Sequence, residues 1–254
     1  MHLDSHNDEK FLKKHNIEYA MTICCKLNTI VDLEKFSEHV LLLNDGIVCV
    51  KYGDPSDPAT NRSIINTIKN KTTRFFYNQA TVLIKPKNDN PQAKYIQIKI
   101  FKNGSVQMCG CKSFDDFYDV VSTLINVLKA GNNSGIDFIT NYEDIGIYDI
   151  ITPMIIANYS LGFQINVDNL LKLLKQNHDS TTTDTDIGYV KLIDKLFVGS
   201  RCNIEYDNDN NKIKIIVYRE KIFIWAKSLD EIVAAYNYIN MILAKYINEI
   251  NVIG

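Results

Sequence analysis

The stretch that decides the fold spans residues 94–128 and reads KYIQIKIFKNGSVQMCGCKSFDDFYDVVSTLINVL. It predicts a strand, a tight turn, a second strand and a long helix. A second copy spans residues 211–243 and reads NKIKIIVYREKIFIWAKSLDEIVAAYNYINMIL. The two copies align through both strands and the helix when the second turn is made two residues shorter. Agreement over three consecutive elements indicates an internal duplication.

The strand that opens this unit separates apolar from polar side chains. Its apolar face carries Ile96, Ile98 and Ile100, and its other face carries Gln97, Lys99 and Phe101. Asn103-Gly104 is a strong hairpin signal, and Ser113 is a typical residue for the start of a helix. The pattern therefore predicts the α+β class, with an antiparallel sheet that has helices on one face and a mixed surface on the other.

The duplication predicts how the chain is divided. We expect a flexible N-terminal tail at residues 1–16 and a first repeat at 17–130, lengthened by an insertion at about 44–74. A linker at 131–149, rich in Asn and Gly at its start, leads to a second repeat at 150–254.

Composition limits the function classes. The apolar and charged fractions, 46% and 23%, are those of a soluble globular protein, and no apolar run is long enough to span a membrane. The polar N-terminus predicts no signal peptide, so we expect the six Cys to stay reduced. The net charge of −2 argues against a simple nucleic-acid binder. Basic residues are in excess only in the first half, which is the better partner for a polyanion.

The sequence shows no catalytic or metal-binding motif. It contains no GxGxxG, P-loop, GxSxG or HExxH pattern. Cys24-Cys25 and Cys109-x-Cys111 do not have the spacing of a zinc knuckle. We therefore expect no enzyme, no metal and no cofactor, although a site assembled from distant residues leaves no linear trace.

The duplicated pattern resembles the TATA-box-binding protein family. The resemblance rests on IKIFKNGSVQMCGCKS (98–113), RFFYNQATVLIKP (74–86), FQINVDNL (163–170) and KLFVG (195–199), and it extends over about residues 17–250. It implies that the two repeats form one curved antiparallel sheet, a saddle, with helices on the convex face. The abundance of Asn, Ile, Lys and Asp suggests an AT-rich genome, and we expect a divergent member from a large DNA virus.

The resemblance also implies where DNA would bind. In that family the concave face of the sheet sits on the minor groove, and aromatic side chains wedge into base steps and kink the duplex. Carried over, the wedges are Phe76, Phe101, Phe197 and Tyr218. For Phe76 and Phe197, an ordinary core role at the start of a strand is an equal alternative. Phe101 lies opposite the isoleucine face, so a core role is not open to it.

The remaining concave-face residues differ between the repeats. The first repeat is expected to present Ala20, Thr22, Gln97, Lys99, Gln107 and Cys109, and the second Met154, Ile156, Lys214, Ile216, Ile222 and Ile224. Where the family has Asn, this chain has Ala20 and Met154, and where it has Thr, this chain has Cys109 and Ile224. The first repeat is thus better suited to a groove than the second.

Two functions from different classes follow. The first is a TATA-box-binding-protein-like initiation factor that binds and bends AT-rich double-stranded DNA and recruits general transcription factors or RNA polymerase subunits. It would act in the nucleus or in a viral replication or transcription compartment, or be packaged in the virion. The alternative is a saddle that has lost base readout and uses its apolar concave face for protein–protein contact or self-association.

Overall fold

A computed structural model describes residues 4–44, 46–65, 76–87, 95–179, 201–208 and 211–252. The chain forms two compact units. Ala20–Pro153 form one, which we call the first-repeat unit, and Met1–Tyr19 with Met154–Gly254 form the other, the second-repeat unit.

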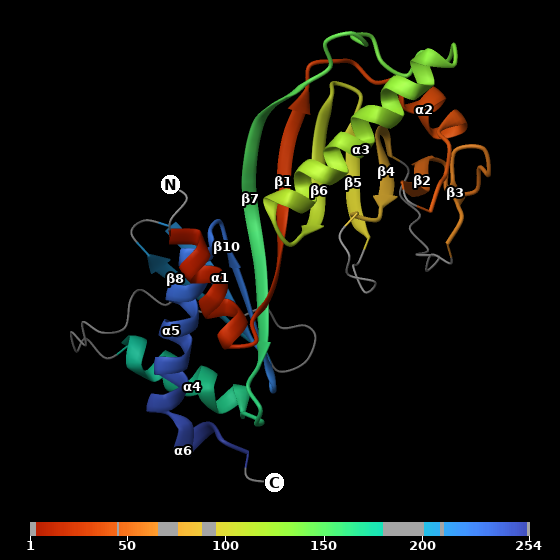
Figure 1. The fold of residues 1–254 in the computed structure, drawn as a ribbon. Helices are drawn as coiled ribbons and strands as arrows, with labels where there is room; N and C mark the ends of the chain where they lie inside the picture. Colours follow the sequence, from red (N-terminus) through yellow and green to blue (C-terminus); the bar gives the residue numbers. More distant parts are fainter. Residues whose placement is uncertain are drawn as a thin grey trace. The chain divides into compact units, whose positions relative to one another are not determined.

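The first-repeat unit is an antiparallel sheet with helices on one face (Figure 1). Its strands lie in the order β3-β2-β4-β5-β6-β1, and Figure 1 shows α3 running obliquely across β6, β5 and β4. In chain order its elements are β1 (Glu18–Leu27), α2 (Leu33–His39), β2 (Ile47–Gly53), β3 (Arg62–Ser63), β4 (Phe76–Ile84), β5 (Ile96–Phe101), β6 (Ser105–Cys111) and α3 (Phe114–Asn133).

The second-repeat unit has the same order of elements without the β2–β3 addition, and it has two further helices, α1 before its first strand and α6 at its end. Its strands lie in the order β7-β10-β9-β8. In chain order its elements are α1 (Asp4–Lys14), β7 (Ile147–Ser160), α4 (Val167–Asp179), β8 (Cys202–Asn208), β9 (Asn211–Val217), β10 (Lys221–Ala226), α5 (Leu229–Lys245) and α6 (Ile247–Ile250). The predicted α+β class with two repeats is thereby confirmed.

Each core lies between a sheet and its long helix. In the first-repeat unit, Ile98 and Ile100 are fully buried together with Phe117 and Leu124 of α3. In the second-repeat unit, Ile213 and Ile215 of β9 are buried, as are Ile232 and Ile239 of α5. Each such side chain contributes roughly 1.5–3 kcal/mol on transfer from water. The alternation read from the sequence thus places the apolar face of each strand under a helix.

The two long helices share one contact at their start. Asp116 accepts a hydrogen bond from the backbone N–H of Lys112 at 2.8 Å, and Glu231 accepts one from Lys227 at 2.7 Å. Ser113 also caps α3 by accepting from the N–H of Asp116, whereas the side chain of Ser228 makes no cap hydrogen bond to α5. Both carboxylates are buried, and each satisfies a backbone donor just before its helix. The duplication therefore extends to the chemistry that starts each helix.

The N-terminal segment differs from the prediction. Residues 1–16 were expected to form a flexible tail, but Asp4–Lys14 form α1, which contacts α5. Leu12 is buried, and the ring of Phe11 meets that of Tyr236 edge-on at 5.5 Å. His15 Nδ1 lies 3.1 Å from the hydroxyl oxygen of Tyr236. Apolar burial and this aromatic contact stabilise a helix that the polar composition of the segment does not suggest.

Two other segments have more structure than their composition suggests. The predicted linker at 131–149 begins inside α3, which ends at Asn133, and ends inside β7. Phe138 is buried and its ring packs edge-on against Phe36 of α2 at 5.6 Å. Within the insertion at 44–74, β2 pairs with β4 and β3 pairs with β2, so the insertion widens the sheet.

The β5–β6 turn depends on Gly104. This glycine has a φ of +80°, and its carbonyl accepts a hydrogen bond from the N–H of Leu27 at 2.8 Å. A Cβ at this position would collide with the carbonyl oxygens of Leu27 and Thr29. The turn therefore requires glycine for its conformation and also for its close contact with the backbone after β1.

Replacing Gly104 tests this requirement. Gly104→Ala should lower the free energy of unfolding by roughly 2 kcal/mol or more, because left-handed strain adds to a clash with rigid backbone. Gly135→Ala is the matched control, since Gly135 has a φ of +83° but open space around its Cβ position. It should cost about 1 kcal/mol. Urea denaturation measures both, and equal losses would contradict the role of the close contact.

Candidate nucleic-acid interface

The face of the first-repeat sheet opposite α3 carries polar and basic side chains, and we call it the first open face. Strand register aligns its residues in rows across β4, β5, β6 and β1. One row contains Thr81, Lys99, Gln107 and Cys24, and the next contains Leu83, Gln97, Cys109 and Thr22. The structure thus places Thr22, Gln97, Lys99, Gln107 and Cys109 on one face, as the alternation predicts, and Ala20 follows the same alternation on β1.

The electrostatics of this face favour an anion. Lys99 is partly exposed at its centre, and Lys51 of β2 lies beside Thr81. Lys26 is held 3.8 Å from Asp149. Burial, together with the nearby Cys109 thiol, raises the pKa of the Cys24 thiol above its ordinary value. Cys24 therefore stays neutral at neutral pH and does not oppose the positive charge of the lysines.

Aromatic side chains flank one end of the first open face. Phe101 ends β5, is partly exposed, and lies opposite Gln79 of β4. Tyr77 precedes Gln79 by two residues in a part of β4 where the register with β2 is irregular, and 66% of its surface is exposed. Phe76 is the first residue of β4 and its side chain is outside the described part of the chain. Tyr77 is thus an exposed aromatic residue, at the end of the sheet where Phe101 lies, that the sequence comparison missed.

The second open face is the corresponding surface of the second-repeat sheet, and it is more aromatic. Strand register forms one row from Asn158, Phe223, Ile216 and Asn203, and another from Ile156, Trp225, Lys214 and Glu205. Ile156 and Lys214 are therefore where the sequence predicts, and Met154 follows the same alternation on β7. Tyr218 lies just after β9, where its ring meets that of Phe223 at 5.6 Å. Phe197 lies outside the described residues.

Ile222 and Ile224 are not on the second open face, which corrects the prediction. Both are fully buried on the side covered by α5, and Phe223 and Trp225 take the open side instead. Ile222 pairs with Tyr159 and Ile224 with Ala157, both of which belong to the buried face of β7.

The error has a geometric cause. The second copy is two residues shorter, and an even difference confined to the turn would leave the phase of the strand unchanged. In the structure one residue is lost in the turn: residues 101–105 join the paired residues Ile100 and Val106, whereas residues 218–221 join Val217 and Ile222. The other is a β-bulge at Gly110, because the β1–β6 register passes from Cys109 to Cys111. β10 has a continuous register without such a bulge. Phe223 and Trp225 therefore take the open-face positions that the sequence alignment gave to Ile222 and Ile224.

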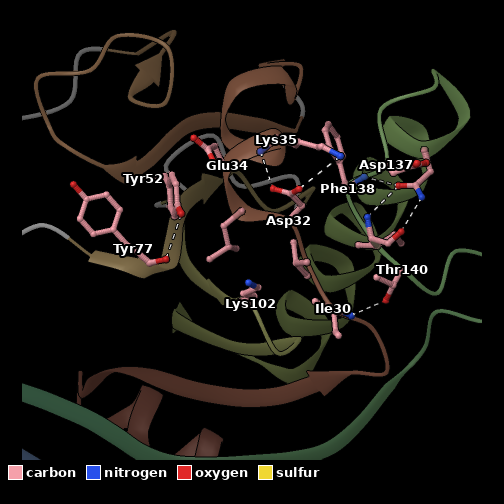
Figure 2. Close-up of a pocket in the computed structure, with 14 residues that line it drawn as sticks. Ile30, Asp32, Glu34, Lys35, Tyr52, Tyr77, Lys102, Asp137, Phe138 and Thr140 are labelled. Atoms are coloured by element: carbon pink, nitrogen blue, oxygen red, sulfur yellow. Dashed lines mark hydrogen bonds and ion pairs between the residues drawn. The ribbon is translucent and has the colours of Figure 1, made fainter.

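A hollow of about 770 Å³ lies in the first-repeat unit beside Tyr77 (Figure 2). Tyr77 and Tyr52 meet edge-on at 6.4 Å, and the Tyr52 hydroxyl donates to the carbonyl of Tyr77 at 3.3 Å. Its charged lining is mixed: Asp32, Glu34 and Asp137 contribute carboxylates, and Lys35 and Lys102 contribute ammonium groups. Lys35 is already 3.7 Å from Asp32. The hollow therefore does not select a ligand of one charge.

The described part of the chain contains no group of three or more His, Cys, Asp or Glu residues that could hold a metal ion. None of its helices is both long and apolar enough to cross a membrane. The candidate interface therefore consists of the open faces of the two sheets, one polar and basic and the other aromatic.

Comparison with known proteins shows the family to which the chain belongs. No protein-family profile matches the chain. A protein of Acanthamoeba polyphaga mimivirus named TATA-box-binding protein-like is 43% identical over 256 residues, which cover 96% of this chain and 70% of that protein. A solved structure titled Methanococcus jannaschii TBP covers 90% of this chain and 98% of its own, with 16% identity and a TM-score of 0.48. On the extent and identity of the mimivirus match, the chain belongs to the TATA-box-binding protein-like family.

Proposed function

We propose that this protein is a transcription initiation factor that binds and bends AT-rich promoter DNA through the minor groove. The observation that carries the proposal is the first open face, where Lys99 and the amides of Gln97 and Gln107 lie on a sheet that ends at Phe101 and Tyr77. Family membership supports it, because the mimivirus relative is named for its likeness to a TATA-box-binding protein.

Each residue type on this face has a use at a minor groove. Lysine ammonium groups neutralise phosphates, and amide groups can pair with the acceptors that A·T base pairs present there. An aromatic ring that enters a base step unstacks it at a cost of a few kcal/mol, offset by the larger surface that the bent duplex contacts. Phe101 and Tyr77 are the aromatic pair of this unit that faces the DNA.

The helix-covered faces would receive proteins. On α3, Phe114 and Tyr118 are exposed aromatic side chains one helical turn apart. General transcription factors or RNA polymerase subunits are the partners that this function requires. The protein acts by binding, without catalysis or a cofactor, and works where promoter DNA is transcribed, in the nucleus or a viral transcription compartment.

The first binding test compares the loss of one positive charge from the first open face with the same loss from α3. Lys99→Ala should weaken binding to an AT-rich duplex roughly 3- to 10-fold and reduce the slope of log K against log salt by about 1. Lys129→Ala removes the same charge from α3 and should leave both quantities unchanged. Fluorescence anisotropy at several salt concentrations measures them. No binding of the native protein at low salt, or equal effects of the two substitutions, would refute the proposed interface.

Bending tests the aromatic pair. Phe101→Ala and Tyr77→Ala should each reduce the bend of an AT-rich duplex, because a wedge is lost while the phosphate contacts remain. Energy transfer between dyes at the two ends of the duplex reports the bend under saturating protein. Phe114→Ala, which removes an exposed ring from α3, is the control. A duplex that remains equally bent by the Phe101 and Tyr77 variants would show that these rings do not wedge.

A second candidate function is protein–protein contact or self-association through the second open face. The observation that favours it is the group of partly exposed apolar and aromatic side chains there: Ile156, Tyr218, Phe223 and Trp225. Exposed apolar surface of this kind marks partner sites in many proteins.

This candidate predicts a change in assembly state. Phe223→Lys places a charge on the second open face without touching the buried Ile222 and Ile224, and it should convert a self-associated protein to monomer. Analytical ultracentrifugation over a range of concentrations measures the mass. A native protein that is already monomeric throughout that range excludes self-association.

A further inference from the structure

Three aromatic rings gather on two adjacent strands of the second open face. Phe223 and Trp225 alternate with buried isoleucines on β10, so both project to the open side, and Tyr218 follows β9 next to them. The Tyr218 and Phe223 rings meet edge-on, with an interplanar angle of 75°. All three are partly exposed. The corresponding register positions of the first-repeat unit hold Gln107 in place of Phe223 and Cys109 in place of Trp225.

Cationic side chains accompany these rings. Lys214 lies opposite Trp225, and its ammonium is 4.5 Å from the centroid of the indole ring. Lys221 begins β10 two residues before Phe223 and is exposed. Glu205, opposite Lys214, is the acidic residue in these rows. Aromatic rings interleaved with cations on an open sheet suit a ligand that has both flat apolar surfaces and negative charge.

Two polar atoms near the rings lack partners among the described residues. Asn203 is 7% exposed and its side-chain oxygen accepts no hydrogen bond, and the indole N–H of Trp225 donates none. Asn203 belongs to the row that also contains Ile216 and Phe223. Buried polar groups are nearly always paired in folded proteins, so unpaired ones beside an open face point to a ligand that supplies donors and acceptors.

We propose that the second open face binds unpaired nucleobases of single-stranded DNA. Bases inside a duplex are stacked on each other and must be unstacked before they offer their faces to Phe223 or Trp225, whereas unpaired bases offer them without that cost. A base that stacks on Trp225 takes the place of the Lys214 ammonium, which is then free to pair with the adjacent phosphate. The inference goes beyond the proposed duplex binding, because it assigns a different ligand to the second repeat.

Trp225 provides a direct reporter, because the chain has one tryptophan. Titration of the full chain with oligothymidylate of about 12 nucleotides should quench its emission to a plateau, more tightly at low salt. Phe223→Leu retains the reporter and an apolar side chain but removes a stacking ring, and should raise the Kd roughly 5- to 100-fold. Met241→Ala removes an exposed apolar side chain from α5, on the other side of the same unit, and should not change the Kd.

The outcomes separate this inference from the proposed function. A protein that binds AT-rich duplex but shows no quenching by oligothymidylate overturns the inference and leaves the proposed function intact. Quenching without duplex binding supports the inference and contradicts the proposed function. Equal Kd values for the native protein and Phe223→Leu would show that no base stacks on Phe223 and would overturn the inference. A lower sedimenting mass for Phe223→Leu, with no quenching of the native protein, assigns the face to a second copy and also overturns it.

Discussion

The alternation of side chains along β5 and β9 is the constraint on which the rest of the structure depends. Successive residues of a strand point to opposite faces, so covering Ile96, Ile98 and Ile100 with α3 leaves Gln97, Lys99 and Phe101 on the other side. The same holds for Ile213 and Ile215 under α5. One burial event in each repeat therefore fixes the core and the open face together. A shift of one residue in register would exchange the two faces completely.

That sensitivity explains what the sequence could and could not predict. Duplication, fold class and the face of β5 follow from local pattern, because an isoleucine at every second position admits one buried side. The face of β10 does not, because Ile222, Phe223, Ile224 and Trp225 are all apolar or aromatic. Aligning β10 with β6 requires knowledge of the bulge at Gly110 in β6 and of the two turn lengths, and a two-residue difference in length reveals neither. Tyr77 was missed for a similar reason, since three consecutive aromatic residues leave the phase of β4 open.

The two repeats share their framework and differ on their open faces. Buried carboxylates begin both long helices, and the strands follow the same order in both sheets. The open faces have no packing partner among the described residues, so substitutions such as Trp225 at the position that pairs with Lys214 do not disturb the core. A duplicated fold can in this way acquire two surfaces of different chemistry, one polar and basic and the other aromatic.

The central claim is that nucleic acid contacts the open sheet faces and not the helices. Lysine acetylation followed by mass spectrometry, with and without a saturating AT-rich duplex, tests it directly because Lys99 and Lys129 lie on opposite sides of the first-repeat unit. The account predicts that the duplex protects Lys99 from acetylation while Lys129 reacts as it does in the free protein. Protection of Lys129 with Lys99 still reactive would contradict the account.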